Sequence, residues 1–256
     1  MTDERPMGVL DVPNEDRALH ASLGGVVYAR LPVRTHLVTP EDDAAEVVRR
    51  YVGELGDDVR LVAISERMVA ITQGRSYPMD QIHSGWLAKL LVRYVTRPGY
   101  GIGLGTPQTM QLAIDEVGVP RILFAAAASA VTKPFGIHGV FYRLAGRQAA
   151  AIDGPTSYTI PPYNQAATLG PKDPDGAARR IAADLDGPVA IIDANDAGCV
   201  VLGASPGVDR RLVQRLFADN PLGQAGEQTP IAVVREVNWP AGQELPPEPR
   251  RRLTPP

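Results

Sequence analysis

The chain has 256 residues, of which 44% are hydrophobic, and its formal net charge at pH 7 is -3. A chain of this size can bury one large core or two modest ones. Because basic and acidic residues are interspersed, the charge pattern predicts no nucleic-acid partner. The start MTDERPMGVL is acidic where a signal peptide is basic, and the longest apolar stretch, ILFAAAASAV, is too short to span a bilayer. We expect a cytoplasmic protein without a membrane partner.

The first part of the chain reads as a polar leader over residues 1–24 followed by a strand, GVVYARLPV. Thr39 is predicted to cap a helix with Pro40 at its first position. The buried stripe of this helix is expected to be Ala44, Val47, Val48, Tyr51 and Leu55. DVRLVAI and RMVAITQG predict two short strands, and HSGWLAKLLVRYV an amphipathic helix.

A glycine-rich stretch, GYGIGLGTP, precedes a helix that Thr106 and Pro107 are predicted to open. Such a loop can approach a phosphate closely, but its spacing matches neither the dinucleotide-binding nor the P-loop motif. A phosphate loop and a tightly packed loop both remain open. RILFAAAA, VFYRLAG and QAAAID are further apolar runs, the first of which also fits a helix.

The last part of the chain repeats the same pattern. KDPDGAARRIAADL predicts a helix capped by Asp173, PVAIID and CVVLG predict strands, SPGVDRRLVQRLF predicts a helix capped by Ser205, and PIAVVRE predicts the last strand. Residues 240–256 are rich in proline and charge and are expected to be disordered. Strands and helices alternate irregularly, so the predicted fold class is mixed α/β, or α+β.

Three features that suggest chemistry have simpler interpretations. GASPG at 203–207 matches the nucleophile elbow of α/β hydrolases, but the residue after Ser205 is Pro206, which has no N–H for an oxyanion hole. The four histidines, His20, His36, His83 and His138, have no spacing typical of zinc ligands. The single cysteine, Cys199, is predicted to be a small buried hydrophobic residue.

Two apolar runs end in a carboxylate, and they are more informative. QAAAIDGP ends at Asp153 and PVAIIDAND at Asp193. If both strands end at the same edge of a sheet, these two carboxylates and the amide of Asn164 or Gln224 form a site of hard oxygen ligands suited to Mg²⁺ or Mn²⁺. The alternative is that each aspartate caps a turn, helped by the nearby glycines.

Taken in order, several stretches resemble the gamma-glutamyl ligase family that adds glutamate to the precursor of the deazaflavin coenzyme F-420. They are LPVRTHLVTPEDD, DVRLVAISERMVAITQGR, LGPKDPDGAARRI, PVAIIDAND and PLGQAGEQTPIAVVRE. The resemblance implies a ligase-like α/β domain over residues 25–239, within which residues 96–137 have no clear counterpart. It also implies a homodimer.

The resemblance assigns roles to individual residues. Asp153, Asp193 and Gln224 are expected to bind the divalent metal. The residues expected to contact the nucleotide are Pro32, Arg34, Thr35, Arg67, Asn164, Leu222, Gly223, Gln224 and Glu227. It identifies no catalytic residue.

The implied reaction is GTP-dependent amide-bond formation with Mg²⁺ or Mn²⁺. The nucleotide activates a substrate carboxylate as an acyl phosphate, which an amine such as glutamate then attacks. The sequence departs from the family pattern where Asp153 and Asn164 are separated by GPTSYTIPPY and where NDAG follows Asp193 and Ala194. An alternative is therefore a non-catalytic homologue that binds a nucleotide or a deazaflavin.

Overall fold

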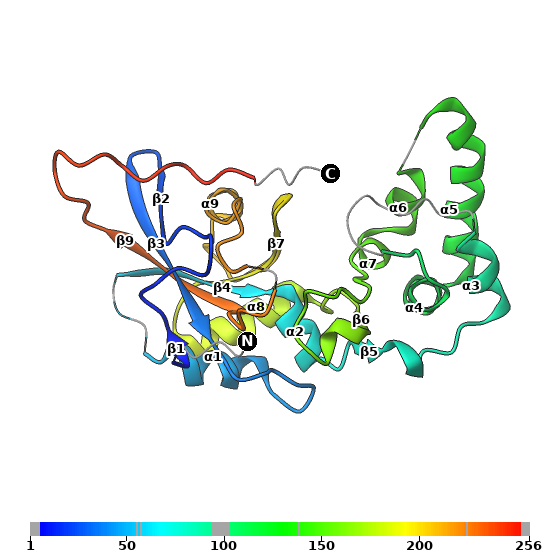
Figure 1. Cartoon of the computed structure of the whole chain (residues 1–256), viewed down its shortest axis with the longest axis horizontal. Coiled ribbons are helices and arrows are strands. Elements are labelled where there is room, and N and C mark those ends of the chain that lie inside the picture. Colours follow the sequence, from blue (N-terminus) through cyan, green and yellow to red (C-terminus); the bar gives the residue numbers. More distant parts are fainter. Residues whose placement is uncertain are drawn as a thin grey trace. The chain divides into compact units, whose positions relative to one another are not determined.

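The chain forms two compact units, and the second is inserted into the sequence of the first. In the computed structural model, residues 6–54, 56, 58–93, 103–137, 139–223 and 225–251 are described (Figure 1). Unit 1 comprises Met1–Gln73 and Pro171–Pro256, and unit 2 comprises Gly74–Gly170. The expected mixed α/β class is confirmed, because the described residues contain both helices and a mixed sheet.

Unit 1 is built on a seven-stranded sheet within the described residues. The strand order is β1-β3-β9-β4-β7-β8, and β2 also pairs with β3. Strands β4 and β7 are parallel, whereas β9 runs antiparallel to both β3 and β4. The strands are β1 (Gly8–Val9), β2 (His20–Leu23), β3 (Val26–Arg34), β4 (Val59–Ser65), β7 (Val189–Asn195), β8 (Gly198–Ala204) and β9 (Ile231–Val237).

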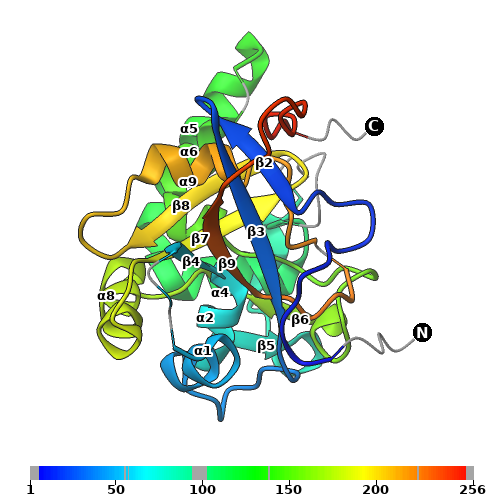
Figure 2. The same cartoon turned by 90° about the vertical axis from the view of Figure 1, so that its left-hand side faces the viewer.

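Helices cover both faces of this sheet, as Figures 1 and 2 show. Helix α9 (Arg210–Leu216) packs on one face, where Ala190 and Ile192 of β7 join its core. Since side chains alternate along a strand, Ile191 points to the opposite face, on which α1, α2 and α8 lie. These three helices are α1 (Ala44–Val52), α2 (Glu66–Thr72) and α8 (Pro174–Leu185).

The predicted cap of the first helix is wrong. Helix α1 begins at Ala44, and the Asp43 carboxylate accepts hydrogen bonds from the N–H groups of Ala45 and Glu46. Thr39 belongs to a preceding turn, in which its N–H and hydroxyl both donate to Asp42. The Pro40 signal therefore marks a turn four residues ahead of the helix.

Two further predicted elements are also wrong. RMVAITQG forms helix α2, in which four consecutive residues, Met68–Ile71, are buried, so its run of apolar residues has no helical period. Ser205 does not cap α9, since that helix begins five residues later behind Asp209, whose carboxylate accepts from the N–H groups of Arg211 and Leu212. Asp173 caps α8 as predicted, and its carboxylate accepts from the N–H of Gly176.

The described part of unit 2 is mainly helical, with one two-stranded sheet formed by β5 (Ser76–Pro78) and β6 (Ala166–Thr168). The runs RILFAAAA, VFYRLAG and QAAAID all lie in or next to helices, and Thr106 and Pro107 open α4 as predicted. Its other elements are η1 (Met79–Gln81), α3 (Trp86–Leu91), α4 (Pro107–Val117), α5 (Val119–Thr132), η2 (Lys133–Phe135), α6 (Val140–Ala145), α7 (Arg147–Ala150) and η3 (Tyr163–Gln165).

Both terminal segments contact the sheet of unit 1. The leader contributes β1 and β2, and residues 240–251 form no helix or strand. Ser22 of β2 nevertheless donates from its hydroxyl to Pro246 O at 2.6 Å.

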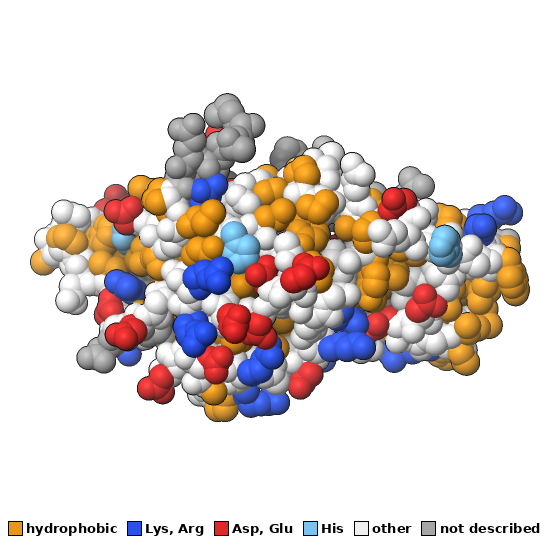
Figure 3. Space-filling view, turned by 90° about the horizontal axis from the view of Figure 1, so that it is seen from below, with side chains coloured by type: hydrophobic (Ala, Val, Ile, Leu, Met, Phe, Trp, Pro, Cys, Tyr) orange, Lys and Arg blue, Asp and Glu red, His pale blue; other side chains and the backbone are white. Residues whose placement is uncertain are grey.

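Among the described helices, none has the length and apolar character needed to cross a membrane. Basic and acidic side chains are interspersed on the face shown in Figure 3.

Candidate functional site at one edge of the unit 1 sheet

The pairing of four strands brings distant parts of the sequence to one edge of the sheet. Ile231 at the start of β9 pairs with Val33 near the end of β3 and with Ile64 near the end of β4. Ser65 at the end of β4 pairs in turn with Ile192 of β7. The end of β3, the end of β4, the end of β7 and the segment before β9 therefore lie side by side. We call this the carboxyl edge, because it carries the C-terminal ends of the parallel strands, where α/β proteins commonly bind ligands.

Arg34 and Thr35 lie at the carboxyl edge, next to the segment that precedes β9. The Thr35 N–H donates to Gln228 O at 3.1 Å, and Arg34 Nη2 lies 3.4 Å from Gln228 Oε1. Pro32 lies further inside the sheet, where it is buried and pairs with Ala232. Of the three residues predicted from this strand, two thus lie at the edge and one in the body of the sheet.

Arg67 lies at the start of α2, directly after β4. It is half-buried, two residues beyond Ser65. The Ser65 N–H donates to Pro230 O at 2.8 Å, which fixes the end of β4 against the segment before β9. One arginine therefore ends β3 and one follows β4 in α2, and arginine is a side chain that commonly binds phosphate groups.

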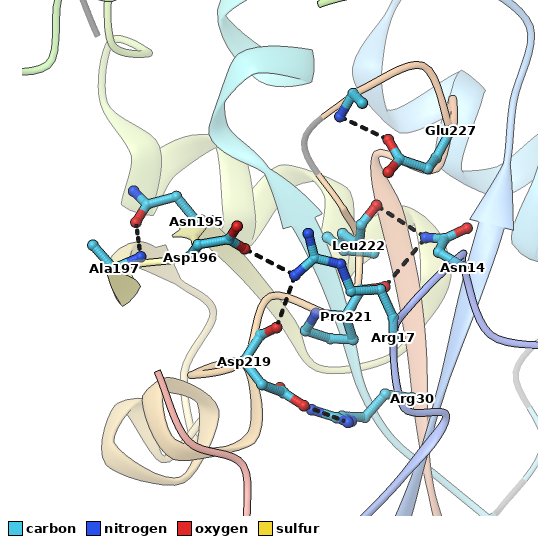
Figure 4. A network of polar contacts seen from close by, with 11 residues as sticks. Asn14, Arg17, Arg30, Asn195, Asp196, Ala197, Asp219, Pro221, Leu222 and Glu227 are labelled. Carbon is cyan, nitrogen blue, oxygen red and sulfur yellow. Dashed lines mark hydrogen bonds and ion pairs between the residues drawn. The ribbon is translucent and has the colours of Figure 1, made fainter. Parts of the chain in front are cut away.

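The end of β7 and the turn after it carry the three polar residues Asp193, Asn195 and Asp196. Figure 4 shows Asn195 and Asp196. Asn195 Oδ1 accepts from the N–H of Ala197 at 2.9 Å, so it shapes the turn into β8. Asp196 is buried and accepts from Arg17 Nη1 at 2.8 Å. Asn195 and Asp196 thus have structural contacts. Asp193 is half-buried and follows Ile192, the residue of β7 that pairs with Ser65 at the end of β4.

Cys199 lies beside the end of β7, since it pairs with Ala194. It is half-buried and packs against the core beneath α9, in agreement with the predicted hydrophobic role. Burial, and secondarily the negative charge of Asp193, raise the pKa of the Cys199 thiol to about 12. The thiol is therefore neutral and unreactive near neutral pH.

The loop between α9 and β9 contains the remaining residues of unit 1 that are predicted to contact the nucleotide. Leu222 is buried in the core beneath α9, and Gly223 has a positive φ of +77°. This φ favours glycine, and a Cβ at Gly223 would also lie 2.3 Å from Glu227 Oε1 and displace that side chain. The Glu227 carboxylate accepts from the N–H of Ala225 at 2.8 Å, which folds the loop over itself.

The base of this loop is held by a residue from the leader (Figure 4). Asn14 is 1% exposed, and its Nδ2 donates to Leu222 O at 2.9 Å, to Pro221 O at 3.2 Å and to Thr229 Oγ1 at 2.8 Å. The Thr229 hydroxyl in turn donates to Leu222 O at 2.9 Å. One side chain therefore closes the loop by binding both of its ends.

Asp153 and Asn164 belong to unit 2. Asp153 is exposed, and its backbone pairs with Thr168 at the end of β6 through two 2.9 Å hydrogen bonds. Asn164 lies in η3, just before β6. Asp193 belongs to unit 1, and Gln224 lies outside the described residues. That Asp153, Asp193 and Gln224 meet at one metal stays a prediction.

Within unit 1, the carboxyl edge offers oxygen ligands but no cluster of acids. Asp193 Oδ1 lies 3.4 Å from the amide Nδ2 of Asn195. Among the described residues, no group of three or more His, Cys, Asp and Glu side chains could hold a metal ion. The further oxygen ligand expected from unit 1, Gln224, lies outside the described residues.

The elbow motif has a purely structural role in the fold. Ser205 is 6% exposed, and its hydroxyl accepts from the N–H of Val189 at 3.0 Å. It therefore fixes the start of β7, at the end of the strand opposite Asp193. Of the four histidines, His138 lies outside the described residues.

Sequence reasoning missed Asn14 and Arg17, which lie in a leader that resembles an unstructured segment. The hydrogen-bond partners of these residues lie about two hundred positions away in sequence, so no local pattern signals them.

Comparison of the chain with models of known protein families gives no match, and none of the curated proteins matches it.

Proposed function

We propose that the protein is a nucleotide-dependent, metal-requiring ligase that joins a substrate carboxylate to an amine, as in the F-420 gamma-glutamyl ligases that its sequence resembles. One observation carries the proposal. The carboxyl edge of unit 1 contains residues predicted from separate stretches of the sequence. Those expected at the nucleotide are Arg34, Thr35, Arg67, Leu222, Gly223 and Glu227, and the one expected at the metal is Asp193.

The chemistry of the edge suits a nucleoside triphosphate. The guanidinium groups of Arg34 and Arg67 offer positive charge and several N–H donors to phosphate oxygens. Asp193 supplies a hard carboxylate ligand of the kind that Mg²⁺ and Mn²⁺ prefer, with Asp153 and Gln224 as the expected partners. A bound metal would neutralise phosphate charge during transfer of the γ-phosphate to the substrate carboxylate. The residues of the edge would hold nucleotide and carboxylate in line.

Titration calorimetry with GTP and ATP, each with Mg²⁺ or Mn²⁺, tests the nucleotide site. We expect saturable binding of one nucleotide that Asp193→Ala abolishes. Ser205→Ala, at the far end of β7, is the matched control and should bind as the wild type does. Absence of binding in the wild-type chain with either nucleotide and either metal would refute the proposal.

A second candidate is a non-catalytic homologue that binds a nucleotide or a deazaflavin. The departure from the family pattern at NDAG favours it, because Asn195 shapes the turn into β8 and Asp196 binds Arg17 of the leader. Formation of GDP or ADP with release of inorganic phosphate, measured across a panel of carboxylic acids and amines, separates the two. Turnover above that of Asp193→Ala excludes the non-catalytic candidate. We propose that the protein acts in the cytoplasm as a homodimer.

A further inference from the structure

The leader segment between β1 and β2 is built into the carboxyl edge. Asn14 reaches both ends of the loop between Leu222 and Thr229, as described above. Three residues later, Arg17 Nη1 donates to Asp196 Oδ1 at 2.8 Å and to Asp219 O at 3.2 Å. This guanidinium therefore joins the turn after β7 to the chain that enters the loop (Figure 4).

The anchor beneath this contact is a buried ion pair. Arg30 of β3 is 1% exposed and contacts both carboxylate oxygens of Asp219, with Nη2 3.0 Å from Oδ2. The same guanidinium donates to Leu216 O at 2.6 Å and to Ala18 O at 2.7 Å. The end of α9, the start of the loop and the leader are thus fixed to one side chain of the sheet.

These contacts connect the loop to the turn after β7 at the carboxyl edge. The loop and the turn after β7 approach each other from different parts of the sequence, and Asp219 is the residue through which Arg17 joins them. The hydrogen bonds of Asn14 and Arg17 described above are all made with other groups of the protein. A change in either side chain would therefore alter where the loop lies relative to Asp193, without removing any group that is expected to bind the nucleotide.

We infer that Asn14 and Arg17 are positioning residues that set the distance between the loop at 219–229 and the end of β7. The link between these two residues and nucleotide binding rests on the proposed function. Their bracing of the loop, which means that they hold it at a fixed distance from β7, does not rest on it. Asn14 acts through the backbone of the loop, and Arg17 acts through Asp196 and Asp219. We expect both residues to act through these protein contacts and not by binding the nucleotide.

Hydrogen exchange of the nucleotide-free protein tests the bracing directly. In Asn14→Ala we expect faster exchange confined to peptides covering residues 219–229, and in Arg17→Met faster exchange there and at residues 193–197. Ser205→Ala is the control, because it removes an equally buried hydrogen bond at the other end of β7. It should leave both regions unchanged. Unchanged exchange at 219–229 in Asn14→Ala, or a rise spread equally over all strands of unit 1, overturns the inference.

Nucleotide affinity is the second readout, measured at a temperature at which each variant is fully folded. Loss of a residue that orients binding groups typically weakens binding by about 10- to 100-fold. We expect a loss of this size in Asn14→Ala, with Ser205→Ala unaffected. Asn14→Asp should be at least as weak, since it places an acceptor against the carbonyl oxygens of Pro221 and Leu222. Wild-type affinity in both Asn14 variants overturns the positioning role. A wild-type chain that binds no nucleotide overturns the proposed function instead, and the exchange result then decides the bracing alone.

Discussion

Arg17 and Asp196 form an ion pair of 2.8 Å whose two side chains are 10% and 11% exposed. This pair connects the leader to the turn between β7 and β8, across 179 positions of sequence. Because each charge has been removed from most of its water, each depends on the other for stabilisation. Loss of one partner from such a pair commonly costs about 3–5 kcal/mol, whereas loss of both can cost much less.

We therefore predict that Arg17→Met destabilises unit 1 by about 3 kcal/mol or more, and that the double variant Arg17→Met/Asp196→Asn recovers a large part of this loss. Urea unfolding in a Trp86→Phe background provides the measurement, because Trp239 in unit 1 is then the only tryptophan. Additive effects of the two substitutions would show that the ion pair contributes little.

The cap of α1 can be tested by a matched pair of substitutions. Asp43→Ala removes the carboxylate that accepts from Ala45 and Glu46, and loss of such a cap costs about 1 kcal/mol. Thr39→Ala, the cap that the sequence suggests, removes only the hydroxyl contact with Asp42 at 3.1 Å and should cost less. Urea unfolding of both variants gives the order, and a larger effect at Thr39 would place the start of the helix earlier than Ala44.

The sequence was sufficient for elements whose pattern is local. GVVYARLPV, PVAIID and PIAVVRE lie in strands because their apolar residues are continuous or alternate, and Asp173 with Pro174 marks the start of α8. It failed for Met68–Ile71, where a helix buried on all sides has the same apolar run as a buried strand. Ser205 failed as a cap because its hydroxyl pairs with Val189, a strand neighbour that no local pattern reveals.

The candidate site was predictable only in part, for a similar reason. Residues that end strands, such as Arg34 and Asp193, can be located from the strands themselves. Their meeting at one edge depends on the strand order, in which β9 lies between β3 and β4. Asn14 was beyond reach, because its role follows from a loop that lies over two hundred positions away.

Gly203 marks a close contact between α8 and β8 that should not tolerate any side chain. A Cβ there would lie 2.2 Å from both C and O of Pro174, and the Asp175 carboxylate already fixes this turn of α8 by accepting from the Ala204 N–H at 2.9 Å. Gly203→Ala should therefore cost about 1–3 kcal/mol, as overpacking does elsewhere. Gly226→Ala, whose Cβ meets nothing within 4 Å, is the control and should be close to neutral in urea unfolding.

Cys199 provides a chemical probe of the charge on Asp193. With a thiol pKa of about 12 in the folded protein against the usual value of 9.0, the thiolate at pH 9 should be roughly 500-fold scarcer than in the unfolded chain. Alkylation by iodoacetamide should accordingly be slow in the native protein up to pH 10 and fast in urea. Since the negative charge of Asp193 contributes to the raised pKa, Asp193→Asn should lower that pKa and speed alkylation at a given pH. Asp184→Asn, an exposed change on α8, should have no effect. Equal alkylation rates in the wild type and Asp193→Asn would mean that burial alone protects the thiol and that the Asp193 charge does not act on it.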